Sequence, residues 1–524
     1  MASTSKPTPD DIVAQALQTL DIQTQHEKAC LLEAQYWLEN SGLDDQSLDD
    51  CTTLPFVTID NPDSRDLDQA LLIEREAQGF RVRYALADAA YYVRPGSALF
   101  KSALSKGTTY YTPTMAAAML PTELSEGLVS LNPNVDRRAL VFDMSVDSLG
   151  VVSRSTVVRA RINSHAKLNY AGVQAWLDSG VADSEPYHES LRLLQELGNI
   201  LIFASAQRGV VSFDRTETQI SVEGDPPRFE ASIRERYDTE RYNEQISLLC
   251  NMQGAEMLLA LSGISDATQA VFRVHDAPLR KNLNKLRTTL DALAELEDQS
   301  DLWRWKKDQS LADYVESLPD DKPHRRKVRT VQRQIMQAQR ASTFQPDAGE
   351  HHALKAASYA RFSSPMREIV GIFTHKELLE SLGGHPIGND EADGVLRDAV
   401  ISSANSAKQR QRQLDKLIEF SALHSVFSRQ LASDNPPTLH GTLIGMRRDR
   451  LYISLDDLAS DIKLYREDIE NQFATEYVIS EVLATPKNPT KPTWQLGQGV
   501  LLRLSAYDKE RKRFLFLVDR EHNE

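Results

Sequence analysis

Cysteine is scarce in this chain of 524 residues. Only Cys30, Cys51 and Cys250 occur, and no two of them form a Cys-x-x-Cys pair. This spacing indicates neither a disulfide framework nor a cysteine zinc site. Long apolar runs are also missing: no segment is long enough to span a bilayer, and Met1–Pro7 has no apolar core of a signal peptide. The sequence therefore predicts a cytoplasmic protein without a membrane segment.

Positive charge is in short supply as well. The chain has 60 Lys and Arg against 75 Asp and Glu, which gives a formal net charge of -15. This balance argues against a protein that coats nucleic acid through its overall charge, so any contact with RNA would need a locally basic surface. With 41% apolar residues the chain can bury a large core, and its length predicts two or three domains.

Two tracts of the sequence are locally basic. The first lies within residues 324–340, and the second has Lys408, Arg412 and Lys416 at i, i+4 and i+8. Each tract has two interpretations: a solvated helix face, or a stripe that follows a phosphate backbone. The helical spacing of the second tract favours the stripe.

An acidic loop between two apolar segments is the most informative local pattern. Asp60, Asp66 and Asp68 stand at i, i+6 and i+8, and the turn-forming residues 61–64 let the chain reverse between them. Carboxylates held close together raise one another's pKa unless a cation neutralises them. Mg²⁺, which prefers oxygen ligands, suits such a cluster best; the alternative is a solvated acidic turn. Gln69 follows directly and offers a carbonyl oxygen without charge.

Hydrophobic periodicity divides the chain into three parts. Residues 1–51 have helical spacing, 52–433 mix strand and helix patterns in an α+β module, and 434–524 begin with a proline-containing linker. The last part contains about five strand patterns, which predict a small β-barrel of the OB type. The predicted helices are 9–37, 190–206, 244–259 and parts of 280–345; the predicted strands are 56–59, 70–73, 80–86, 439–446, 450–455, 496–504 and 511–518.

Seven motifs in collinear order resemble those of the ribonuclease II family, whose catalytic module is called the RNB domain. They are residues 60–71, 84–97, 109–125, 130–133, 167–170, 208–213 and 359–367. The resemblance implies an RNB catalytic module, a mixed sheet with surrounding helices, over residues 52–433. It also implies an S1-type RNA-binding OB fold over 434–524. Full-length members carry two small RNA-binding barrels before the catalytic module, and the helical segment 1–51 is too short to supply them.

The activity that the resemblance implies is hydrolysis of single-stranded RNA from the 3′ end to nucleoside 5′-monophosphates. Two divalent ions held by shared carboxylates suit this reaction, because they neutralise the phosphate, activate water and stabilise the leaving oxygen. Asp60, Asp66 and Asp68 match the family's ligands. Gln69 stands where the family has a fourth Asp, so we expect weaker binding of Mg²⁺, or a preference for Mn²⁺.

Four further positions match RNA-contacting residues of the family. Tyr111 and Phe213 match an aromatic pair that clamps the terminal base, and the alternative for each ring is an ordinary core aromatic. Tyr170 and Glu244 match contacts to the terminal ribose, where a 2′-hydroxyl distinguishes RNA from DNA. The alternative for Glu244 is a surface helix acid.

Two cations complete the predicted site. Arg367, within the 359–367 motif, is expected to meet a phosphate or to brace the acids. The family's phosphate-holding arginine in a late helix falls near Lys416, which grips phosphate as a point charge without a bidentate fork. His351 and His352 have the chemistry of metal ligands, but structural or exposed roles are the commoner interpretation.

Three functional hypotheses follow. The leading one is a metal-dependent exoribonuclease whose substrate is single-stranded RNA. Its expected partners are other proteins of RNA degradation. The substitutions at Gln69 and Lys416 favour a second, a catalytically impaired RNA-binding protein with the same fold. The third is an acidic metal protein unrelated to RNA, which would leave the collinear motifs unexplained.

Overall fold

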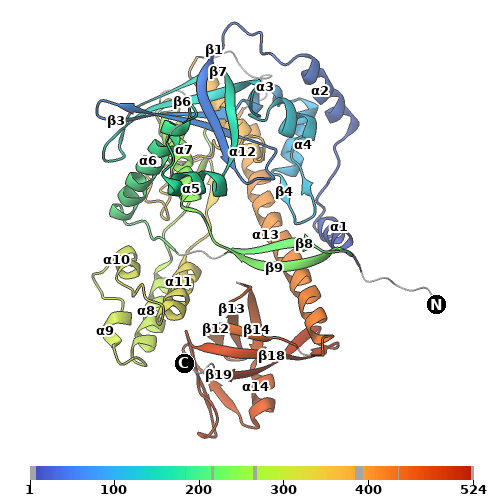
Figure 1. The fold of residues 1–524 in the computed structure, drawn as a ribbon, viewed down its shortest axis with the longest axis vertical. Coiled ribbons are helices and arrows are strands. Elements are labelled where there is room, and N and C mark those ends of the chain that lie inside the picture. The colour runs from blue at the N-terminus through green and yellow to red at the C-terminus, as the bar shows by residue number, and fades with distance from the viewer. Residues whose placement is uncertain are drawn as a thin grey trace, which may run out of the picture.

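The chain folds into an upper α+β part and a lower part made of sheets (Figure 1). The computed structural model describes residues 7–182, 184–213, 217–263, 268–383, 393–434, 436–458 and 460–520. Helix α13 (Asp393–Leu431) runs from the upper part to the lower one (Figure 1). None of the helices within the described residues is both long and apolar enough to cross a membrane.

A closed barrel forms the centre of the upper part. Its strands follow the order β1-β2-β3-β6-β7, and every pair is antiparallel except β1 with β7. The predicted mixed sheet is therefore confirmed, and it closes on itself. The strands are β1 (Asp49–Asp60), β2 (Gln69–Glu76), β3 (Gly79–Ala87), β6 (Asp136–Asp147) and β7 (Val152–Asn169).

Alternation along the strands gives the barrel two apolar faces, because successive side chains of a strand point to opposite sides. Ala70 and Leu72 of β2 join one buried cluster with residues of the N-terminal helices. Leu71 of β2 and Tyr84 of β3 join another cluster with residues of two long helices that follow β7. The acidic loop connects β1 to β2 at one end of the barrel.

Helices pack around the barrel, and the helices predicted over 190–206, 244–259 and parts of 280–345 are confirmed. The helices before α13 are α1 (Pro9–Thr19), α2 (Lys28–Glu39), α3 (Ala89–Tyr92), α4 (Ala98–Lys106), the π-helix η1 (Glu123–Leu128), α5 (Tyr170–Ser179), α6 (His188–Gln207), α7 (Asp238–Ser262), α8 (Arg280–Ala294), α9 (Ser300–Trp303), α10 (Leu311–Glu316), α11 (Arg325–Ala338) and α12 (Ile369–Ser381). Of these, α8 to α11 lie beside the lower part (Figure 1). Short strand pairs lie between them: β4 (Tyr110–Tyr111) with β5 (Ala116–Ala117), β8 (Glu217–Glu223) with β9 (Arg228–Arg234), and β10 (Phe272–Val274) with β11 (Thr343–Gln345).

The N-terminal helical pattern is two helices rather than one. Thr8 caps α1 through a reciprocal capping box with Asp11, and α1 ends before Asp21, whose φ is 51°. Helix α1 buries Leu17 against α13, whereas α2 packs on α4 and leaves Leu32 62% exposed. The break therefore sends the two helices to different neighbours.

The lower part contains a five-stranded sheet in the order β14-β13-β12-β18-β19 and a three-stranded sheet, β15-β16-β17. This arrangement is consistent with the predicted OB-type fold. Its elements are β12 (Thr438–Arg447), β13 (Arg450–Leu455), β14 (Asp461–Tyr465), α14 (Arg466–Phe473), β15 (Tyr477–Ile479), β16 (Leu483–Pro486), β17 (Trp494–Gln495), β18 (Gly499–Asp508) and β19 (Arg513–Arg520). The exact domain boundaries stay predictions.

The basic tract within 324–340 was a candidate RNA-binding surface, but two of its cations contact the lower part of the protein instead. Arg326 pairs with Asp456 at 2.8 Å, and Arg333 pairs with Asp461, so two of its cations reach acids of the lower sheets. Apolar residues of α8 and α11 share one buried cluster with residues of the lower sheets. The tract therefore helps to dock the lower part onto α11.

Candidate active site

The acidic loop and the start of α5 meet at one end of the barrel. Asp60 is the last residue of β1, and the parallel register sets it beside Asn169, the last residue of β7. The Asn169 side chain caps α5 by accepting a hydrogen bond from the amide of Gly172 at 2.8 Å. The first residue of α5 is Tyr170, so this residue follows directly from the strand end beside Asp60.

A turn before α12 forms the second wall around the acids. Asp68, only 2% exposed, accepts a hydrogen bond at Oδ1 from the amide of Met366 at 2.8 Å. Its Oδ2 forms an ion pair with Nε of Arg367 at 2.7 Å. Asp68 thus presents a buried carboxylate whose two oxygens face the Met366 amide and the Arg367 guanidinium.

The charges of this cluster are strongly coupled. Burial raises the pKa of Asp68 to about 7, although Arg367 and the Met366 amide act in the opposite direction. Burial lowers the pKa of Arg367, but Asp68, Tyr111, Asp66 and Asp60 outweigh it and raise that pKa above its ordinary value. All three acids of the loop therefore act on one guanidinium group.

Tyr111 closes another side of the acidic cluster. Its hydroxyl donates a hydrogen bond to the carboxylate of Asp66. The residue lies on β4 and is 44% exposed, so its ring remains open to a ligand. Tyr111 and Arg367 both line a pocket of about 350 Å³ beside the acids.

This pocket is rich in cations. Besides Arg367 it is lined by Arg273, Arg361, Lys408 and Arg412, with Glu368 as its single acid. Arg361 holds Glu368 through two hydrogen bonds of 3.0 and 3.2 Å. The excess of positive charge, in a chain with a net charge of -15, makes this a concentrated anion site.

Lys408 belongs to the buried floor of the pocket. Its Nζ donates to the backbone carbonyl of Ser342 at 2.9 Å and to the Ser342 hydroxyl at 2.8 Å. Burial lowers the pKa of Lys408 to about 8, and the charges of Arg273 and Arg412 add to this shift. An anion in the pocket would stabilise the protonated amine.

The predicted cation on the late helix lies outside the pocket lining, and its role stays a prediction. Lys416 of α13 is exposed and does not line the pocket, whereas Arg412, one helical turn earlier, does. Arg412 was already part of the basic stripe in the sequence. The spacing of that stripe indicated the helix face on which Lys408 and Arg412 line the pocket. No motif in the helix indicated which residues of that face reach the pocket.

Phe213 and Tyr111 have different surroundings. Phe213 packs against the cluster shared by α8, α11 and the lower sheets, while Tyr111 lines the pocket. Two rings that hold a base between them need not touch each other, so the clamp by Tyr111 and Phe213 stays a prediction.

The residues matched to the ribose site have close polar partners. Asn243 donates a hydrogen bond to the hydroxyl of Tyr170 at 3.3 Å, and burial together with Asp60 raises the pKa of Tyr170 to about 12. Glu244 is about half exposed and accepts a hydrogen bond from Arg236 at 3.0 Å. Nothing in the sequence indicated that Asn243 contacts Tyr170, apart from its position directly before Glu244.

Gln69 has both ends of its amide engaged. The hydroxyl of Tyr84 donates to Oε1 at 2.6 Å, and Nε2 donates to the backbone carbonyl of Ser363. One lone pair of the amide oxygen remains. The role of Gln69 as a metal ligand stays a prediction at this point.

The acidic loop suits a divalent ion by its chemistry. Asp60, Asp66 and Asp68 offer only oxygen ligands, the kind that Mg²⁺ prefers, and Oδ2 of Asp68 already faces the cation of Arg367. The three carboxylates do not lie within 4.8 Å of one another. Mg²⁺ needs only one or two carboxylates beside water and substrate phosphate, so this spacing fits an open site rather than a closed cage.

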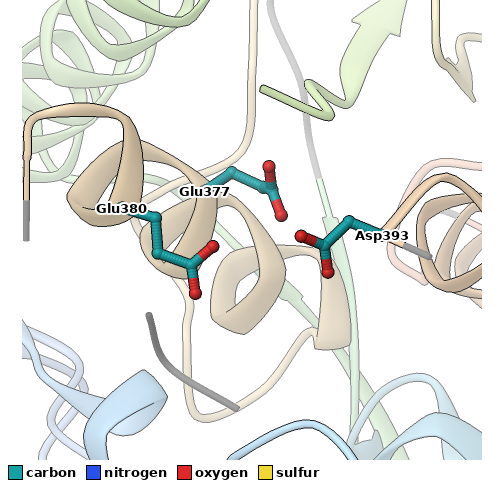
Figure 2. Close-up of side chains that lie close together, drawn as sticks. All are labelled: Glu377, Glu380 and Asp393. Carbon is teal, nitrogen blue, oxygen red and sulfur yellow. The ribbon is translucent and has the colours of Figure 1, made fainter. Parts of the chain in front are cut away.

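A second acidic group lies elsewhere. Figure 2 shows the carboxylates of Glu377 and Asp393 facing each other, with Glu380 nearby. Among the described residues, these are the only three acids gathered within 4.8 Å. The amine of Lys376 lies 2.8, 2.7 and 3.1 Å from Glu377, Glu380 and Asp393 respectively, so an internal cation already neutralises the group. We assign it a structural role.

His351 and His352, which lie outside the pocket lining, are assigned structural roles as well. His351 is buried beside His275, with ring centroids 5.2 Å apart, and burial lowers its pKa to about 3. Nδ1 of His275 accepts a hydrogen bond from the amide of Ala353, and Nε2 donates one to the backbone carbonyl of Arg340. Neither His351 nor His352 belongs to a three-ligand group in the described chain.

A barrel with an acidic loop at one end, facing a cation-lined pocket, defines a fold and site of the RNB type. Residues 48–383 match the sequence model of the family described as RNB domain. The chain belongs to this family, and the expected membership of the ribonuclease II family is confirmed.

Sequence relatives and solved structures agree with this assignment. Ribonuclease R of Escherichia coli (strain K12) is 27% identical over 479 residues, which cover 89% of this chain and 57% of that protein. Ribonuclease R of Vibrio parahaemolyticus is 32% identical over 336 residues, covering 63% of this chain and 38% of that protein. The chain thus spans little more than half the length of the E. coli relative.

Two solved structures share the fold. Mycoplasma genitalium RNase R in complex with ribose methylated single-stranded RNA matches with a TM-score of 0.83 at 19% identity, over 98% of this chain and 78% of that one. Yeast Ssd1, a pseudonuclease, matches with a TM-score of 0.68 at 14% identity, over 95% of this chain and 58% of that one. The same fold therefore accompanies both a ribonuclease and a pseudonuclease.

Proposed function

We propose that the protein is a metal-dependent exoribonuclease that hydrolyses single-stranded RNA from the 3′ end to nucleoside 5′-monophosphates. The observation that carries this proposal is the buried carboxylate of Asp68, ion-paired at 2.7 Å with Arg367, which lines a cation-rich pocket. The Ribonuclease R relatives support the same reaction class. A single-stranded nucleic acid combines anionic phosphates with stackable bases, and its 2′-hydroxyls would distinguish RNA from DNA.

The chain's own residues would bind and orient the substrate. Arg367 and Arg412 supply forks for phosphate oxygens, and the half-exposed ring of Tyr111 supplies a stacking face for a base of any identity. Tyr170 and Asn243 offer hydroxyl and amide groups to the terminal ribose. We assign the phosphate contact to Arg412 in place of Lys416.

Asp60, Asp66 and Asp68 would hold the divalent ion, Mg²⁺ or Mn²⁺. When bound, such an ion neutralises phosphate oxygens and lowers the pKa of a water molecule. Asp68 must be ionised to act as a ligand, and Arg367 favours that ionised form. The hydroxyl of Tyr111 orients Asp66.

The test is a time course of cleavage with 5′-labelled single-stranded RNA, in Mg²⁺ and separately in Mn²⁺. We expect a ladder of products shortened from the 3′ end. The Asp68→Asn variant should bind the same RNA within about threefold and lose cleavage by at least about a thousandfold, because a carboxylate ligand is removed. Wild-type protein that leaves RNA intact under both ions would overturn the proposal.

A second candidate function has its own support. The neutral amide of Gln69 replaces a charged position of the family and is tied to the protein at both ends. This favours an RNA-binding protein that retains the cation-lined pocket without cleavage. RNA that shifts in a gel in a salt-dependent manner, yet remains intact with either ion, would establish this alternative.

The cellular setting follows from the same proposal. We infer a cytoplasmic location and contacts with other proteins of RNA degradation, as expected for a protein that acts like its Ribonuclease R relatives. Fractionation of cells and co-purification on RNA would test both points.

A further inference from the structure

Gln69 and Asp68 are neighbours in sequence but face different sides of the barrel wall. Along β2, Ala70 and Leu72 join the same cluster, whereas Leu71 joins the cluster that contains Tyr84. Alternation places Gln69 with Leu71 and Tyr84, and its amide oxygen accepts the Tyr84 hydroxyl at 2.6 Å. The Asp68 carboxylate lies on the opposite side, against Met366 and Arg367.

The other end of the Gln69 amide reaches a rigid turn. Nε2 donates to the backbone carbonyl of Ser363. Asn251 of α7, fully buried, accepts hydrogen bonds from the amides of Phe362 at 2.7 Å and Ser363 at 3.1 Å. The same side chain donates to the Ser363 hydroxyl at 3.0 Å. The turn is thus held by α7 on one side and by β2 on the other.

Asp68 and Gln69 therefore grip a single turn at two points. Gln69 binds it at Ser363, and Asp68 binds it at the amide of Met366, next to Arg367. We propose that Gln69 is a positioning residue, which ties the start of β2 to the 363–367 turn and so keeps Asp68 and Arg367 in place, and that it is not a metal ligand.

The chemistry of the two contacts explains why an amide stands here. The side chain must accept a hydrogen bond from a hydroxyl at one atom and donate a hydrogen bond to a carbonyl at the other, which glutamine does and an ionised carboxylate does not. A carboxylate at this position would repel the Ser363 carbonyl oxygen, and that carbonyl would lose its hydrogen-bond donor. Gln69 is therefore a substitution that the surrounding turn requires, rather than a lost ligand that an acid would restore.

The experiment compares three variants with the wild type: Gln69→Glu, Gln69→Asp and Gln69→Met. The methionine variant is the matched control, because it loses both hydrogen bonds without adding charge. Four quantities are measured: the thermal midpoint without divalent ions, the Mn²⁺ affinity by calorimetry, the RNA affinity and the cleavage rate. Only the cleavage measurement rests on the proposed exoribonuclease function.

We expect all three variants to lower the thermal midpoint and none to bind Mn²⁺ more tightly than the wild type by more than about threefold. Cleavage should fall about tenfold or more, with RNA affinity kept within about twofold, because a buried hydrogen bond that orients the site is lost. An acid variant that binds Mn²⁺ about tenfold more tightly, or cleaves faster than the wild type, would overturn the inference.

Tyr84→Phe decides the matter if the Gln69 variants do not fold. It removes only the hydroxyl that holds Oε1 and keeps the ring. A positioning role predicts slower cleavage with unchanged Mn²⁺ binding; a ligand role predicts tighter Mn²⁺ binding, because the variant releases the amide oxygen that the hydroxyl now occupies. If wild-type protein cleaves no RNA, the proposed function fails, while the midpoints and Mn²⁺ affinities still decide the role of Gln69.

Discussion

Single residues at the acid cluster are held by very few contacts, and their chemistry depends on those contacts. The structure brings Asp60, Asp66, Asp68 and Arg367 together, in line with a dense run of charge beside strand signals, and their roles stay predictions. The sequence did not indicate which residue of α13 lines the pocket, nor which apolar cluster Phe213 joins. Each turn of a helix with repeated Lys, Arg and Gln looks the same, and an isolated aromatic carries no information about which apolar cluster it joins.

At this scale the first prediction concerns Arg412. Arg412→Ala should weaken binding of single-stranded RNA about tenfold and reduce the salt dependence of binding by about one unit of slope, since one phosphate contact is lost. Lys416→Ala is the matched control, because Lys416 lies on the same helix but outside the pocket lining. Equal effects of the two substitutions would contradict the assignment to Arg412. Fluorescence anisotropy at several salt concentrations measures both.

The second residue-scale prediction concerns pH. Burial raises the pKa of Asp68 to about 7 in the folded chain, above its ordinary value near 4 in the unfolded chain. The folded state thus binds this proton more tightly, and the stabilisation is lost as pH rises from about 4 through about 7. In buffer without divalent ions, we compare the thermal midpoints of Asp68→Asn and the wild type. The difference, variant minus wild type, should increase between pH 5 and pH 8. A difference that does not change with pH would contradict the raised pKa.

Elements are positioned here mainly by apolar contacts with α13. The strands and long helices were predictable, since alternation and helical periodicity are local signals. The break between α1 and α2 was not, because the residues on either side continue the helical spacing and the choice of neighbour is a tertiary effect. Closure of the barrel through β1 and β7 was also beyond the sequence, since pairing between distant strands leaves no local pattern.

The element-scale prediction tests the contact of α1 with α13. Leu17 is 2% exposed in the cluster shared by these helices, whereas Leu32 of α2 is 62% exposed. Leu17→Ala should lower the free energy of unfolding by roughly 2–4 kcal/mol, and Leu32→Ala should change it by less than about 0.5 kcal/mol. Thermal unfolding of the two variants beside the wild type checks the ranking. Similar midpoints would mean that α1 contributes little to the folded core.

The whole molecule joins its two parts through a mixed interface of apolar side chains and ion pairs. Composition predicted an acidic protein with a local basic surface, and the structure divides the cations between two tasks. Those of α11 pair with acids of the lower sheets, and those around Arg367 line the pocket. Sequence alone could not distinguish the two tracts, because the acids that neutralise the first lie far along the chain.

The prediction at this scale is a charge exchange between the parts. Arg326→Asp should lower the thermal midpoint, because it places two carboxylates at a contact that now spans 2.8 Å. The double variant Arg326→Asp/Asp456→Arg should recover most of that loss, with a coupling free energy of about 1 kcal/mol for a partly exposed pair. A double variant no more stable than the single one would show that the pair does not contribute to docking.

The parallel pairing of β1 with β7 has a consequence for when the site comes into being. The two strands are separated by most of the barrel sequence, yet their ends carry Asp60 and the residue before Tyr170. Pairings of such long range are completed late, after the local hairpins have formed. A chain that has not closed its barrel carries the acids without the tyrosine beside them. The proposed nuclease activity is thereby reserved for fully folded molecules, and a partly folded nascent chain would leave the RNA around it intact.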